Sequence, residues 1–135
     1  MSIMQWQDNL SVGVNEIDNQ HKALINIINR IYDCIDSPSE RQQIAKLLPE
    51  LYWYASEHFK HEELFMFETS YPQREEHREI HHEMLSEVQN LIDNLSKEIT
   101  ETQHIADFFK KWLLKHITVE DQDYAKHAEV LPQAR

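Results

Sequence analysis

The sequence predicts an all-α protein, an up-down-up-down antiparallel four-helix bundle preceded by an N-terminal arm. Four segments carry apolar residues at alternating spacings of four and three, the pattern of a helix with one buried face. The two-residue alternation typical of strands is absent from the sequence, and the single glycine, Gly13, leaves little material for tight β-turns. Because the connections between the four segments are short, neighbouring helices should pack antiparallel.

The first predicted helix spans residues 17–36, with Asp18 as its N-cap or as an acid in its first turn. The second begins at Ser37, which has capping-box spacing to Glu40. Pro49 lies inside the second pattern and predicts a kink or a break about one turn earlier. The buried stripes of these helices are Ile17, His21, Leu24, Ile28, Ile31 and Ile35, and then Ile44, Leu47, Leu48, Leu51, Ala55, His58 and Glu62.

The third predicted helix follows Tyr71 and takes Pro72 as its first residue, a position where a helix tolerates proline. The fourth begins with a second capping box, from Thr100 to Gln103. Their buried stripes are His77, His81, Met84, Val88, Leu91 and Leu95, and then Ile105, Phe108, Phe109, Trp112, Leu113, His116 and Ile117.

The composition predicts one small acidic domain over residues 1–135, with an arm (1–16), a bundle (17–127) and a tail (128–135). The formal net charge of −11 argues against binding to nucleic acid or to an anionic membrane surface. One cysteine, Cys34, excludes an intrachain disulfide and fits a reducing compartment, where we interpret it as an apolar filler. Since neither a signal peptide nor an apolar run of about 20 residues is present, we expect a soluble, cytoplasmic monomer without membrane insertion.

Nine histidines are the unusual feature of this composition, and five of them occupy buried stripe positions together with Glu62. One buried histidine would be explained by a single hydrogen bond, but five imidazoles and a carboxylate in one core are costly unless something else satisfies them. A metal ion of the iron, zinc, manganese or copper type accepts both kinds of ligand. The stripe histidines are His21, His58, His77, His81 and His116, whereas His61, His82, His104 and His127 lie beside or off the stripes.

The stripe histidines also share one level of the predicted bundle. His21 lies near the start of the first helix and His116 near the end of the fourth, while the others lie near the end of the second helix and the start of the third. In an antiparallel bundle these ends meet. His58 and Glu62, like His77 and His81, are spaced i, i+4 and can face one centre. Because this donor set exceeds what one tetrahedral zinc accepts, the sequence predicts a dinuclear site with a bridging carboxylate.

Over nearly its whole length the sequence resembles the hemerythrin family, specifically the prokaryotic single-domain bacteriohemerythrins. The resemblance lies in residues 11–14, 17–22, 58–63, 71–72, 77, 81, 112–117, 121 and 124. It implies one iron ion held by His77, His81 and His116, and a second held by His21 and His58. It further implies that Glu62 and Asp121 bridge the two ions together with an oxo or hydroxo group, and that dioxygen binds at an open position of the second ion. Phe59, Trp112, Leu113 and Ile117 would line that position.

Asp121 is the one implied ligand that helical spacing does not favour. It lies five residues after His116, about 140° around a regular helix, whereas Glu120 would share the face of His116. The intervening residues 117–119 are all β-branched, which disfavours a regular helix. We therefore predict a wide turn, a π-bulge or a helix end between His116 and Asp121.

Two other metal chemistries are disfavoured. A ferritin-like di-iron site needs Glu-x-x-His on two helices, but the available strings end at the off-stripe His82 and His104. A zinc protease helix needs glutamate directly after its first histidine, which the His77–His81 pair lacks.

The resemblance favours an oxygen carrier, store or delivery protein that is not an enzyme and that serves an oxygen-consuming enzyme. An oxygen or redox sensor, a peroxide-handling di-iron protein with oxidase or peroxidase activity, and an iron buffer remain the alternatives. Trp6, Trp53 and Tyr124 are interpreted as structural.

Overall fold

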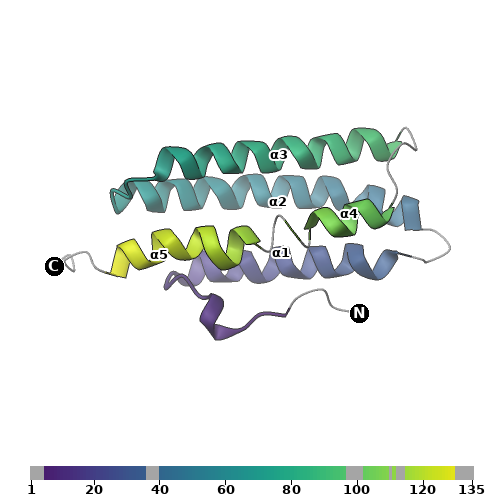
Figure 1. Ribbon diagram of the computed structural model, residues 1–135. Helices are drawn as coiled ribbons and strands as arrows, with labels where there is room; N and C mark the ends of the chain where they lie inside the picture. The colour runs from purple at the N-terminus through teal and green to yellow at the C-terminus, as the bar shows by residue number, and fades with distance from the viewer. Residues whose placement is uncertain (1–4, 36–39, 97–101, 110, 112–114, 130–135) are drawn as a thin grey trace.

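The computed structural model describes residues 5–35, 40–96, 102–109, 111 and 115–129. The regular secondary structure of these residues is helical throughout, and it forms the predicted four-helix bundle (Figure 1). Helix α2 packs against both α1 and α3, and the fourth position is shared by α4 and α5, which follow one another beside α1. The helices are α1 (Asn15–Cys34), α2 (Glu40–Glu68), α3 (Arg74–Ser96), α4 (Thr102–Phe108) and α5 (Asp121–Glu129), with a π-helical turn, η3 (His116–Glu120), directly before α5.

The N-terminal arm is tied to the first turn of α1 by a buried carboxylate. Asp18 accepts hydrogen bonds from the Val12 backbone N–H (2.9 Å) and from the Ser11 hydroxyl (2.5 Å). Between Val12 and the start of α1 the chain turns at Gly13, whose φ of 82° is one that residues with side chains rarely adopt. Because α1 begins at Asn15, earlier than predicted, Asp18 is an acid of the first turn and not the N-cap.

Helix α2 is continuous through Pro49, so a break of this helix was the wrong prediction. Proline removes one backbone hydrogen bond, but the residues around it are anchored on the core side: Leu48 and Leu51 are both fully buried. Their packing keeps the segment helical where the local propensity alone favours interruption. The predicted capping box at Ser37 lies outside the described residues.

Helix α3 begins two residues later than predicted. Tyr71 and Pro72 belong to a turn in which the Arg74 N–H bonds to the Tyr71 carbonyl (3.2 Å), and the first helical residue is Arg74. The predicted start of the fourth helix at Thr100 lies outside the described residues, and α5 extends to Glu129, two residues past the predicted end of the bundle. Among the described residues, no helix is sufficiently long and apolar to cross a membrane.

The apolar interior consists of two clusters with a polar layer between them. Along α1, Ile17 belongs to one cluster and Leu24 to the other, and the buried His21 lies between them. Along α2, Glu62 lies in the same way between Phe59 and Met66. The larger cluster contains Leu24, Ile28, Ile31, Ile44, Leu48, Leu51, Val88, Leu91, Leu95 and Ile105 among others; the smaller contains Val12, Ile17, Met66, Tyr71, Tyr124 and Ala125.

Candidate metal centre

Seven buried polar side chains form the layer between the two apolar clusters. Helix α1 contributes one, α2 and α3 contribute two each, and the chain around the junction of η3 and α5 contributes two. Each is at most 4% exposed, so water cannot satisfy them. They are His21, His58, Glu62, His77, His81 and His116, which the stripe pattern placed together, and Asp121, which the family resemblance added.

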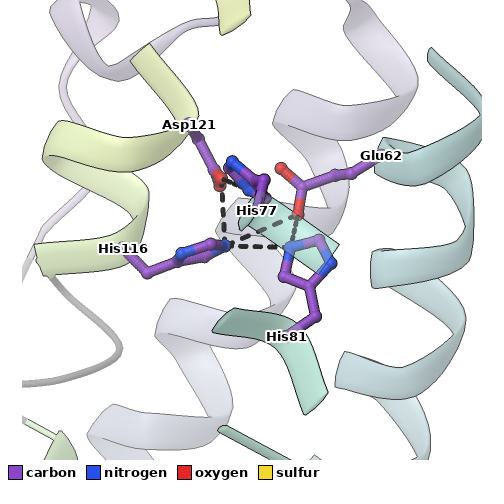
Figure 2. Close-up of side chains that lie close together, drawn as sticks. All are labelled: Glu62, His77, His81, His116 and Asp121. Atoms are coloured by element: carbon purple, nitrogen blue, oxygen red, sulfur yellow. Dashed lines mark hydrogen bonds and ion pairs between the residues drawn. The ribbon is translucent and has the colours of Figure 1, made fainter. Parts of the chain in front are cut away.

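These side chains form two groups whose nitrogen and oxygen atoms lie within 4.8 Å of one another. Both groups contain Glu62 and Asp121. We call them the three-histidine group (with His77, His81 and His116) and the two-histidine group (with His21 and His58). Figure 2 shows the three-histidine group, with its imidazoles and carboxylates pointing toward one another.

The two oxygens of Asp121 face different groups. Its Oδ1 lies 3.0 Å from the Nε2 atoms of His77 and His116, and its Oδ2 lies 3.0 Å from His21 Nε2. A carboxylate in this position presents one oxygen to each group. Its geometry is that of a bridge.

Glu62 also reaches both groups. Its Oε1 lies 3.1 Å from His58 Nε2 and 3.3 Å from His81 Nε2, while its Oε2 lies 3.7 Å from His21 Nε2. The hydroxyl of Tyr124 donates a hydrogen bond to Oε2 over 2.5 Å. This fixes the carboxylate between the two groups. Tyr124, expected from the sequence to be structural, thus contacts the polar layer directly, and the contact joins residues 62 positions apart.

The junction between η3 and α5 explains how Asp121 joins His116. Residues His116–Glu120 form a π-helical turn, as the β-branched residues predicted. A π turn is wider than an α-helical one, so residues five apart come onto the same face. Asp121 is therefore fully buried beside His116, whereas Glu120 reaches the Nδ1 side of the ring from a partly exposed position.

The inward-facing atoms of the layer approach one another as ion pairs, but among the described residues they make no hydrogen bond of satisfactory geometry. These atoms are His21 Nε2, His58 Nε2, His77 Nε2, Glu62 Oε1 and both oxygens of Asp121. Buried polar atoms without partners are rare and costly. The inward direction of these atoms and their donor chemistry fit a cation bound between them.

His81 and His116 give the sharpest version of this test. Their Nδ1 atoms donate outward to the carboxylates of Glu63 (2.8 Å) and Glu120 (3.3 Å), so a neutral ring carries a lone pair on Nε2. Yet these two Nε2 atoms lie only 3.1 Å apart. Two neutral rings would repel each other at this distance, so without metal one ring must be protonated and donate to the other. Nitrogens bound to one ion at about 2.1 Å and at right angles also lie about 3 Å apart. The donor set therefore fits a metal ion.

The outward-facing Nδ1 atoms of three imidazoles are hydrogen-bonded to side chains that the sequence did not single out: Gln20, Glu63 and Glu120. Gln20 Oε1 accepts a hydrogen bond from His58 Nδ1 over 2.6 Å, as the two carboxylates do for His81 and His116. Such outer partners orient metal-binding histidines and fix their tautomer. A signal was present: Gln20 and Glu63 neighbour a stripe residue directly, and Glu120 lies one turn after His116.

Without metal, the two buried carboxylates favour protonated imidazoles. Burial lowers the pKa of His21, but its close contacts with Asp121 and Glu62 outweigh burial and raise that pKa to about 9. Burial also lowers the pKa of His116, but the attraction of Asp121 outweighs burial and raises that pKa to about 10. Burial raises the pKa of Glu62, yet the attraction of His58 leaves it well below its usual range. A metal ion must therefore displace protons from this layer.

The predicted oxygen-pocket residues are only partly described. Phe59 is buried and stacks on the His81 ring, with ring centroids 3.8 Å apart and planes within 6°. Ile117 is buried next to His116. Trp112 and Leu113 lie outside the described residues.

The off-stripe histidines stay outside both groups. His82 and His104 are exposed, which removes the basis of a ferritin-like site. His61 is half-exposed and contacts Gln20, and His127 bonds to the Thr69 carbonyl over 2.8 Å.

A buried, two-part cation site inside a four-helix bundle defines a class of metal-binding proteins, and comparison with known proteins identifies the family. Residues 12–128 match the hemerythrin HHE cation binding domain, and the chain belongs to this family.

The chain is similar to known hemerythrins over most of its length. A bacteriohemerythrin of Pseudomonas aeruginosa is 30% identical over 92% of this chain and 80% of its own length. A myohemerythrin of Riftia pachyptila is 29% identical over 88% of each. The crystal structure of a wild-type hemerythrin superposes with a TM-score of 0.82 at 26% identity, covering 94% of this chain and 98% of that one.

Proposed function

We propose that this protein binds dioxygen reversibly at a pair of iron ions and acts as an oxygen carrier, store or delivery protein. The observation that carries the proposal is the inequality of the two groups. Both share Glu62 and Asp121, but one adds three imidazoles and the other adds two. The two-histidine group therefore offers one protein ligand fewer, which leaves room for an external ligand.

In this proposal, His77, His81 and His116 hold one ion, His21 and His58 hold the other, and Glu62 and Asp121 bridge both beside an oxo or hydroxo group. The contacts of Asp121, which presents one oxygen to each group, support the bridging role. A bound iron pair supplies two electrons to dioxygen and recovers them when dioxygen leaves.

The surrounding residues determine whether binding is reversible. Phe59 and Ile117 are buried and apolar, and we assign them, with Trp112 and Leu113, the role of excluding water and proton donors. An excluded proton supply favours release of dioxygen over its reduction. On this basis we expect a binding protein and not an enzyme, delivering dioxygen to an oxygen-consuming enzyme.

The experiment loads the full chain with Fe(II) without air, admits oxygen and records the visible charge-transfer spectrum. A stable oxygenated spectrum that disappears on removal of oxygen and returns over repeated cycles supports the proposal. Protein loaded with zinc, which has no redox chemistry, is the matched control and should show no visible band. Prompt, irreversible oxidation with peroxide release would instead support the peroxide-handling alternative and overturn reversible binding.

The pocket role has its own test in Ile117→Asn. An amide at this buried position admits hydrogen bonding and water, so the lifetime of the oxygenated form should fall by roughly tenfold, about 1.4 kcal/mol of barrier. Ile117→Val keeps the surface apolar and should leave the lifetime nearly unchanged. Equal lifetimes in both variants would contradict the role given to this residue.

A further inference from the structure

The two groups differ in what holds the outer faces of their imidazoles. In the three-histidine group, two rings donate from Nδ1 to carboxylates: His81 to Glu63 and His116 to Glu120. In the two-histidine group, His58 donates to the neutral amide of Gln20, and His21 Nδ1 has no hydrogen-bond partner among the described residues. The outer charges thus lie on one side of the centre.

Each outer carboxylate lies partly buried beside its imidazole. Glu63 follows Glu62 on α2, accepts from His81 through Oε2 and faces the Arg78 guanidinium at 3.7 Å through Oε1. Glu120 ends the π turn that positions Asp121, and its side chain is only 26% exposed. Both carboxylates are therefore partly withdrawn from water, which strengthens their effect on the rings that they contact.

Gln20 occupies the matching position on the other side without adding charge. Its Oε1 accepts from His58 Nδ1, and its Nε2 faces His61 Nδ1. This amide can orient the His58 ring as a carboxylate would. It cannot draw the Nδ1 proton toward a negative charge, so it raises the electron density on Nε2 less than a carboxylate does.

We propose that Glu63 and Glu120 are positioning residues that make the three-histidine group the tighter and more readily oxidised half of the centre, and that the neutral Gln20 keeps the two-histidine group the weaker half. This inference rests on the proposed function, because it assumes that both groups hold an ion. A weaker half with lower ligand basicity retains its open position for an external ligand. The tighter half anchors the pair.

The number of imidazoles alone already makes the groups unequal, so the test changes only the outer partners. Glu63→Gln and Glu120→Gln keep the hydrogen-bond acceptor and remove the charge. Gln20→Glu adds the charge on the other side. Glu83→Gln is the matched control, because Glu83 lines the same surface cavity of about 450 Å³ as Glu120 and carries the same charge. Among the described residues Glu83 has no hydrogen bond to an imidazole.

The first readout is titration of the metal-free full chain with Co²⁺ against a competing chelator, followed by the visible spectrum. The unchanged protein should bind two equivalents, one more tightly than the other. Glu63→Gln and Glu120→Gln should each weaken the tighter equivalent by roughly 10- to 100-fold, the usual cost of losing an outer partner. Gln20→Glu should strengthen the weaker equivalent, and Glu83→Gln should change neither.

The second readout is the midpoint potential of the iron-loaded protein. Removing a negative charge from the outer face of a ligand disfavours the more oxidised iron, so Glu63→Gln and Glu120→Gln should raise the potential. Gln20→Glu adds a negative charge and should lower the potential. A merely structural role for these residues would not shift the potential in opposite directions. The melting temperature of each metal-free variant confirms that it is folded.

Equal behaviour of Glu63→Gln, Glu120→Gln and Glu83→Gln in both readouts would overturn the proposal, as would equal weakening of both equivalents. If the carboxylate variants do not fold, the Gln20→Glu result decides alone. Because Co²⁺ binding involves no oxygen, two unequal equivalents with the expected shifts but no reversible oxygenation would overturn only the proposed function. A single equivalent in the unchanged protein would contradict both.

Discussion

The larger apolar cluster and the polar layer of this bundle are built on the same helical spacing but differ in what they do. In the half around Leu48 and Leu91, stripe positions are aliphatic and fully packed. In the layer around Glu62 and Asp121, the same stripe continues with buried imidazoles and carboxylates, several of whose inward-facing atoms make no hydrogen bond within the described residues. The comparison shows that the spacing decides which residues meet, whereas their chemistry decides whether the meeting stabilises the fold or binds a ligand.

The largest expected effect comes from the shared acid of the polar layer. Glu62→Ala removes a ligand from both groups at once, so bound iron should fall from two ions per chain to well below one. The metal-free variant should also lose stability, because the buried imidazoles and the Tyr124 hydroxyl lose the acceptor that they share. Metal analysis of the purified protein measures the first effect and thermal unfolding the second. Retention of two ions would contradict the shared role.

A single histidine of the three-histidine group should have a related but smaller effect. His77→Ala leaves the two-histidine group intact, so iron content should fall to about one ion per chain, measured by the same metal analysis. Full occupancy in this variant would contradict the assignment of His77.

A substitution in the larger apolar cluster should lower stability without lowering iron content. Leu48→Ala removes a fully buried aliphatic side chain from the larger cluster and should lower the free energy of unfolding by about 2–5 kcal/mol. Iron content per folded chain should stay unchanged, since the polar layer is not touched. Denaturant unfolding of the metal-free protein provides the measurement. A loss of iron equal to that of Glu62→Ala would contradict the distinct roles of the larger apolar cluster and the polar layer.

Tyr124→Phe tests the contact between the polar layer and the smaller cluster. The variant leaves Glu62 Oε2 without its buried donor, which should cost about 1–3 kcal/mol of stability. Tyr71→Phe is the matched control, because Tyr71 packs against Tyr124 but does not contact Glu62 in the described structure. Chemical unfolding of both variants should separate them. Equal losses would contradict a specific role for the Tyr124 hydroxyl.

The last expected effect is a pH dependence that distinguishes metal-free from metal-loaded protein. The pKa of His21 is raised to about 9 and that of His116 to about 10, so protonated rings stabilise the metal-free fold. That stabilisation is complete below the unfolded value of 6.5 and is lost as the pH rises through 9 to 10. The melting temperature of the metal-free protein should therefore fall over this window. The metal-loaded protein, whose rings are already deprotonated, should change less.

Much of the fold was predictable because the stripe spacing is regular. The spacing of four and three predicted the four helical segments, and the short connections between them predicted antiparallel packing, which brings five histidines to one level. The family resemblance favoured Asp121 over Glu120, and with the β-branched run before them it predicted a wide turn, a π-bulge or a helix end; the structure has a π turn there.

The remaining features depend on contacts that periodicity does not encode. Continuity through Pro49 comes from buried neighbours on both sides, and the start of α3 from a turn closed by backbone hydrogen bonds. Gln20 and Glu63 directly neighbour stripe residues but lie at positions that spacing assigns to solvent, so only the packed structure shows which imidazole each one contacts.

The most direct test of the account is crystallography of the iron-loaded protein with anomalous diffraction at the iron absorption edge. Two iron peaks between the apolar clusters, one bound by His77, His81 and His116 and the other by His21 and His58, are the predicted result. A single peak, or a zinc ion alone within this layer, would contradict it.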